Sequence, residues 1–193
     1  MKKAILLIIA STAAALSLNA QISVRISAGA ASGLITSPSK EFVFDRPQTL
    51  YGIYGELYVL DRCTPVYQVD VSKQIGEIFQ AGVGVAISNA TGYTRGVNNV
   101  NNLTKKRVHD YLLVTQGRVK YYSGGDFYLY GGCALGGGYR HIEEHNHIYN
   151  SVAWIYELSP IGIHLGTKRV GFFVEGAIGS LINGCRVGIK YTI

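Results

Sequence analysis

The chain has 193 residues, among them 24 glycines, 14 tyrosines and three cysteines, and its formal net charge is +6. Three cysteines are too few, and odd in number, for a disulfide framework. The charge is mild, and no patch rich in Lys and Arg suggests a nucleic-acid partner, since the nearest cluster is only Lys105-Lys106-Arg107. Abundant glycine and tyrosine with hardly any helical periodicity favours an all-β fold.

The N-terminus has the three parts of a secretory signal peptide in order. Two lysines precede a short apolar run that begins at Ala4, and the small residue Ala20 stands before the expected cleavage site. The apolar run is too short to span a bilayer as a helix. We therefore predict a signal peptide over residues 1–20 and one mature domain over residues 21–193, whose formal charge is +6 − 2 = +4.

Eight segments of the mature chain alternate between apolar and polar side chains, which is typical of β-strands with two different faces. In chain order they lie at residues 22–31, 66–72, 78–88, 110–122, 127–140, 151–166, 170–180 and 184–193. Asn183-Gly184 is a strong hairpin signal before the last segment. Pro160 cannot donate to a strand ladder, so we predict a bulge there and leave the parity beyond it open.

Three other segments lack this alternation. The polar stretch from 32 to 65 contains LYGIYGELYVLDR, which is compatible with a strand extension or with a short helix. Residues 89–106 are polar without periodicity and predict a loop, and HIEEHNHIY at 141–149 predicts a short loop.

The apolar parity could face a packed core, as in a soluble sandwich or lipocalin-like barrel, or it could face outward. The polar parity is rich in glycine and alanine, which suits the crowded interior of a narrow eight-stranded barrel. The apolar parity also ends in aromatic residues, such as Phe127 and Tyr139, as in the girdles of a membrane barrel. We therefore predict an eight-stranded antiparallel up-and-down transmembrane β-barrel with short periplasmic turns and longer extracellular loops. Its last segment closes on residues 22–31, since hydrocarbon does not tolerate an open sheet edge.

Charged residues of both signs lie on the polar parity of separate segments. The cations are Arg25, Arg118, Lys120, Arg186 and Lys190, and the acids are Asp70, Glu157 and Glu175. Because a buried unpaired charge is costly, we predict a lumen network in which at least two of the acids pair with arginines. The candidates are Arg25, Asp70, Arg118, Glu157, Glu175 and Arg186. Glu175 with Arg186 is the preferred pair, because the hairpin makes their strands neighbours, and the network would plug the lumen.

HIEEHNH is the densest cluster of ligand-type residues in the chain. His141, His145 and His147, with Glu143 and Glu144, are candidate ligands for zinc or copper, and the alternative is a polar loop tip. A hydrolase of the barrel type would need a Ser/His/carboxylate arrangement. The other two histidines are His109 and His164, and no serine stands two residues from either of them on the same strand face. We therefore expect neither enzymatic activity nor a cofactor.

The stretches FYLYGGCALGGGYR, YELSPIGIHLG and VGFFVEGAIG resemble the small outer-membrane β-barrel proteins of Gram-negative bacteria, the OmpA/OmpX-type size class. The likeness covers nearly the whole mature chain. It implies the fold and an outer-membrane location rather than an activity, since function is carried by individual sites.

The C-terminus is similar to the signal that the barrel assembly machinery recognises, with Gly188, Tyr191 and Ile193 at its positions. It departs from that signal in lacking a terminal phenylalanine and in having Val187 where a polar residue is usual. The expected partners are therefore this machinery, outer-membrane lipid and lipopolysaccharide. The expected function is a structural or surface-interaction role through the outer loops, and the alternative is an enzyme acting on lipid A or a narrow transporter.

Overall fold

The computed structural model describes residues 21–30, 57–95, 103–144, 147–167 and 169–193. The predicted signal peptide over residues 1–20 lies outside this part of the chain. Within the described residues, no helix combines the length and the apolar character needed to cross a membrane.

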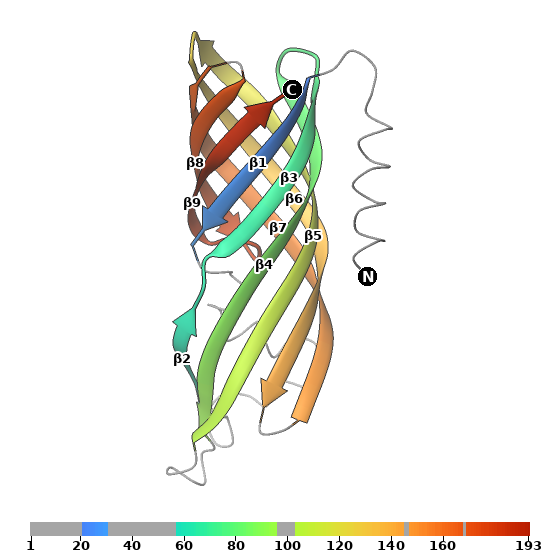
Figure 1. The fold of residues 1–193 in the computed structure, drawn as a ribbon, viewed down its shortest axis with the longest axis vertical. Helices are drawn as coiled ribbons and strands as arrows, with labels where there is room; N and C mark the ends of the chain where they lie inside the picture. Colours follow the sequence, from blue (N-terminus) through green and yellow to red (C-terminus); the bar gives the residue numbers. More distant parts are fainter. Residues whose placement is uncertain (1–20, 31–56, 96–102, 145–146, 168) are drawn as a thin grey trace.

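The described part of the chain forms strands joined by antiparallel pairings. The strands are β1 (Ile22–Gly29), β2 (Leu57–Cys63), β3 (Val66–Ile75), β4 (Phe79–Arg95), β5 (Leu103–Gly124), β6 (Phe127–Glu144), β7 (His147–Gly166), β8 (Val170–Gly179) and β9 (Gly184–Thr192). All except β2 form a closed ring in the order β1-β3-β4-β5-β6-β7-β8-β9, and β9 pairs back onto β1 (Figure 1). The prediction of an all-β, closed, eight-stranded antiparallel barrel is confirmed.

The undecided segment LYGIYGELYVLDR contains a strand. β2 pairs with the second half of β4, from Leu57 opposite Arg95 to Cys63 opposite Ala90. β3 occupies the same side of β4 over its first half, where Tyr67 lies opposite Ile87. β2 therefore continues the line of β3, and the helical alternative is wrong for these residues.

The strands extend to different lengths at the two ends of the barrel. We call the end at which β1 begins and β9 finishes the terminal end, and the opposite end the long-strand end. Tight turns connect strands at the terminal end, where Gly76 and Gly125 have φ values of 68° and 63°, a conformation that favours glycine. At the long-strand end, β4, β5, β6 and β7 run well beyond β1, β8 and β9 (Figure 1).

Two predicted loops are therefore wrong over most of their length. β4 extends to Arg95 and β5 begins at Leu103, and their pairing is unbroken from Arg95 opposite Leu103 to Phe79 opposite Val119. β6 extends to Glu144 and β7 begins at His147, and these two residues are partners. A strand shows apolar alternation only where one of its faces meets an apolar environment. The alternation pattern therefore did not identify the parts of these strands that continue into polar sequence.

The apolar parity of each predicted segment faces outward, and the opposite parity faces inward. On β7, for example, Trp154 is 78% exposed whereas its neighbour Ile155 is 2% exposed. The inward glycines leave room for large side chains from adjacent strands. A Cβ at Gly162 would overlap the ring of Tyr130, and one at Gly188 would lie 2.7 Å from the ring of Phe173.

A bulge at Pro160 changes the parity of β7. The register with β8 shifts between Leu158 and Ile161, which confirms the predicted bulge. Before it the inward residues include Ser159, and beyond it they are Gly162 and His164. His164 is therefore buried inside the barrel, a position that the sequence left open.

Candidate functional site

The inward side chains change character along the barrel. On β5 they run from Lys120 at the terminal end through Arg118 and Gln116 to Val114 and Leu112. Three layers follow from this order. The cationic mouth consists of Lys120, Tyr128, His164 and Lys190. The ion-pair layer consists of Arg25, Asp70, Arg118, Glu157, Glu175 and Arg186. The apolar layer consists of Val66, Ala86, Leu112, Val114, Ala134, Ile155, Ala177, Leu181 and Ile182.

Glu175 is at the centre of the ion-pair layer. One carboxylate oxygen accepts from Arg186, its register partner on β9, and from the Ser159 hydroxyl at 2.6 Å. The other accepts from Arg25 at 3.0 Å and from the Tyr130 hydroxyl at 2.9 Å. Strands from opposite parts of the sequence thus meet at one carboxylate.

The remaining members of the ion-pair layer extend this network. Arg118 lies 3.4 Å from Asp70, and its Nε lies 4.0 Å from Glu175. Arg186 also donates to Glu157 at 2.8 Å. The six candidate residues are brought together, three cations with three acids, and each is at most 5% exposed.

Amide side chains complete the coordination of two arginines. Gln68 accepts from Arg186 at 2.7 Å, and Gln116 accepts from Arg118 at 2.7 Å. Charged groups taken out of water need such hydrogen bonds in addition to their ionic partners. The ion-pair layer and its amide partners therefore join side chains from six strands, β1, β3, β5, β7, β8 and β9, and lie between the cationic mouth and the apolar layer.

The apolar layer closes the lumen next to the ion-pair layer. Leu181 and Ile182 lie in the turn between β8 and β9, and both are 0% exposed. They pack against inward residues of β3 to β8, and a Cβ added at Gly29 would collide with Ile182. This plug was not predicted from the alternation of the strands. The available signal was an apolar pair directly before the polar Asn183-Gly184 turn.

A second buried ion pair lies beyond the apolar layer. Arg140 donates through Nε to Asp110 at 2.8 Å and through Nη2 at 3.2 Å, and Ser88 donates to Asp110 at 3.3 Å. Asp110 and Arg140 are register partners on β5 and β6. Sequence reasoning placed Arg140 on the polar parity but missed the pair, because Asp110 stands where the predicted strand began.

The candidate metal ligands are only partly within the described residues. His141 and His147 are described, whereas His145 lies outside the described part of the chain. His141 accepts or donates at Nδ1 to Asn150 at 2.8 Å, and the ring of His147 contacts Tyr149. Among the described residues no group of three His, Cys, Asp or Glu side chains is placed to hold a metal ion.

The outer surface changes from apolar to polar along one line across four strands. Ile87, Tyr111, Tyr139 and Val152 are register partners in succession on β4 to β7. Two residues further toward the long-strand end, the outward partners are Asn89, His109, His141 and Asn150. His109 bonds Asn89 at 2.7 Å, so this polar row is linked across strands. Polar outward side chains thus replace apolar ones at this row, although Ile148 and Tyr149 beyond it on β7 are exposed as well.

Buried His164 is the most reactive type of side chain in the mouth. Its ring stacks on Tyr128 with centroids 4.3 Å apart, and the described residues give its Nδ1 no hydrogen-bond partner. The Tyr128 ring on which it stacks also lies near the ammonium groups of Lys120 and Lys190. The arrangement is suited to filling and stabilising a lumen.

No protein-family model matches the sequence, and no curated protein matches it.

Proposed function

We propose that this chain is an integral outer-membrane protein of Gram-negative bacteria, an OmpA/OmpX-type barrel with a closed lumen and a structural or surface-interaction role. The observation that carries the proposal is the apolar outer surface of the barrel. Large outward hydrophobic side chains such as Ile26, Leu113, Leu135 and Phe172 are each at least 60% exposed. Soluble monomers rarely expose continuous apolar surface of this extent.

The height of the apolar surface supports a bilayer. Tyr111 and Tyr121 bound it on β5, and they lie 121 − 111 = 10 residues apart. At about 3.3 Å per residue and a strand tilt of roughly 40°, this separation corresponds to about 25 Å along the barrel axis. That is the height of the lipid-facing band in outer-membrane barrels, which aromatic girdles flank. Exposed aromatic residues toward the terminal end include Phe79, Tyr121, Tyr122, Phe172 and Tyr191, and those toward the long-strand end include Tyr67, Tyr111, Tyr139 and Trp154; Tyr149 and Tyr156 on β7 are exposed as well.

The connections suggest the orientation of the barrel. Outer-membrane barrels have short turns on the periplasmic side and longer connections outside. The terminal end, with the turns at Gly76 and Gly125, then faces the periplasm, and the protruding parts of β4 to β7 face the exterior. The polar row of Asn89, His109 and His141 then lies at the level of the lipopolysaccharide headgroups. The protruding strands would be the contact surface for partners.

The interior favours this role over transport. The ion-pair layer and the apolar layer together fill the lumen, so free diffusion through it is not expected. The terminal strand carries the proposed contact with the barrel assembly machinery, and there Tyr191 and Ile193 are exposed on the outer face while Gly188 faces inward.

The proposal predicts cleavage and localisation. The mature protein should begin at Gln21 and fractionate with the outer membrane, because the N-terminal region has the order of a signal peptide. N-terminal sequencing and density fractionation of a Gram-negative host measure both properties. Met1 retained in a cytosolic protein would contradict the proposal.

The proposal also predicts a depth-dependent cost of outward charge. Val83→Arg, in the middle of the apolar surface, should lower the free energy of unfolding from lipid vesicles by about 2–4 kcal/mol. Ser123→Arg, exposed outside the terminal girdle, should cost no more than about 1 kcal/mol. Equilibrium unfolding in urea, monitored by Trp154 fluorescence, measures the difference. Equal small costs at both positions, together with a refolded protein that stays soluble without detergent, would refute a membrane barrel.

A further inference from the structure

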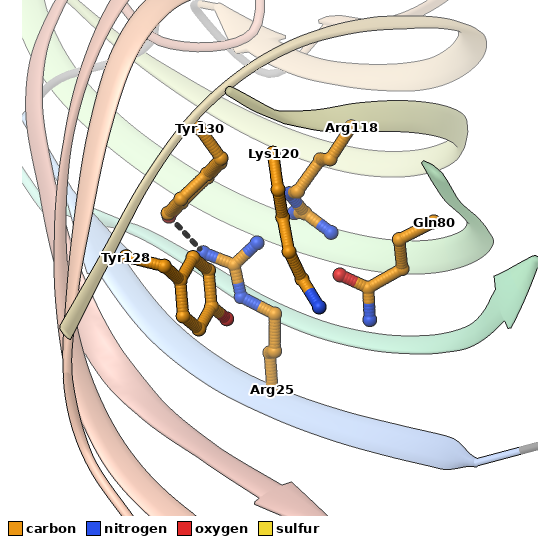
Figure 2. Close-up of a pocket in the computed structure, with 6 residues that line it drawn as sticks. All are labelled: Arg25, Gln80, Arg118, Lys120, Tyr128 and Tyr130. Carbon is orange, nitrogen blue, oxygen red and sulfur yellow. Dashed lines mark hydrogen bonds between the residues drawn. The ribbon is translucent and has the colours of Figure 1, made fainter. Parts of the chain in front are cut away.

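A cavity lies at the cationic mouth, between the strands of the terminal end. It is lined by Arg25, Gln80, Arg118, Lys120, Tyr128 and Tyr130 (Figure 2). Its volume of about 10 Å³ is room for one water-sized occupant. The ammonium of Lys120 extends from β5 into the space between Arg25 and Gln80 (Figure 2). Lys120 is only partly buried, so an occupant can reach the cavity from solution.

The charges around this cavity do not balance. Between the terminal end and the apolar layer, the described inward residues supply five cations and three acids, a surplus of 5 − 3 = +2. The three arginines of the ion-pair layer form ion pairs with all three of these acids. Within the described residues the surplus cations have neutral partners only. Lys120 donates to Gln74 at 3.0 Å, and Lys190 donates to Tyr128 at 3.3 Å.

Two further observations locate this surplus charge at the cavity. The ammonium groups of Lys120 and Lys190 lie 5.2 Å and 5.5 Å from the centroid of the same Tyr128 ring, so like charges gather around one side chain. Arg25 is 2% exposed, and its Nε is a buried donor without a hydrogen-bond partner. An unpartnered buried donor costs free energy unless an acceptor occupies the adjacent space.

We propose that the cavity binds a small monoatomic anion, with chloride as the physiological ion. The anion would accept hydrogen bonds from the Lys120 ammonium and from the unpartnered Arg25 Nε, and it would offset part of the surplus charge. The cavity admits a single water-sized sphere, so a halide fits with a small movement of the flexible Lys120 side chain. A polyatomic anion such as gluconate is too large. This site is independent of whether the outer wall faces lipid.

Thermal unfolding of the mature chain in a non-ionic detergent tests the proposal. Replacing gluconate by chloride or bromide at constant ionic strength should raise the temperature of half-unfolding by about 3 °C, and the rise should saturate with halide concentration. Lys120→Gln should weaken the apparent halide affinity at least tenfold. Lys73→Gln is the matched control, because Lys73 lies near the same end on the outer face of β3 and should leave the affinity unchanged.

Crystallographic bromide supplies a measurement that needs no variant. Crystals grown in bromide should show an anomalous peak in contact with Lys120 Nζ, and this result decides the question if Lys120→Gln does not fold. A non-saturating shift, an equal shift in gluconate, an unchanged affinity in a folded Lys120→Gln, or no anomalous peak in the cavity would each overturn the proposal.

Discussion

Glu175→Gln should lower the free energy of unfolding by about 3–5 kcal/mol, because it leaves buried arginines without their shared counter-charge. Glu175 accepts from Arg25, Arg186, Ser159 and Tyr130, and it is 1% exposed. The amide keeps the shape of the carboxylate but removes its charge and one acceptor. Urea titration of the protein folded in vesicles measures the loss.

The matched control is Glu143→Gln on the outer wall. Glu143 lies 3.7 Å from Arg107, and both side chains are more than 40% exposed. Exposed pairs of this kind contribute at most about 1 kcal/mol, so the control should unfold nearly like the wild type. A Glu175→Gln protein as stable as the control would show that the ion-pair layer is solvated rather than buried.

Much of the barrel could be predicted from the sequence, because alternation follows directly from the pleat. Each residue of a strand faces the side opposite to its neighbour, so parity alone assigns the inward charges. The contact of Glu175 with Arg186 was within reach, since the Asn183-Gly184 hairpin makes them register partners. The contacts of Arg25 with Glu175 and of Arg118 with Asp70 depend on side chains that meet across the lumen. Parity gives the face of each residue but does not predict which side chains contact one another across the lumen.

Other features required information that periodicity does not contain. The protruding parts of β4 and β5 are polar on their outer face, as Arg107 and Glu143 on neighbouring strands illustrate, so they lack the apolar alternation that predicts a strand. The inward position of His164 depends on the number of residues that the bulge at Pro160 absorbs. The inward turn of Leu181 and Ile182 depends on the space that small residues such as Gly29 leave free.

Ile182→Ala should lower the free energy of unfolding by about 2–5 kcal/mol, the range for truncating a fully buried aliphatic side chain. Ile182 is 0% exposed, packs in the apolar layer with Leu181, and lies directly against Gly29. The surrounding wall is a closed sheet whose strands cannot move inward one at a time, so the cavity left by the missing atoms should persist. Urea unfolding in vesicles measures the cost.

The control for the plug is Ile178→Ala, four residues earlier in the chain. Ile178 is 63% exposed on the outer face of β8, so its truncation removes contacts with the surroundings but leaves no internal cavity. We expect a cost below about 1 kcal/mol at this position. The difference between the two alanine variants isolates the contribution of the plug, because both lose the same atoms from neighbouring parts of one hairpin. Equal costs would mean that Ile182 does not pack in the lumen in solution. A large cost at Ile182 alone would establish that the turn between β8 and β9 is folded inward and closes the barrel.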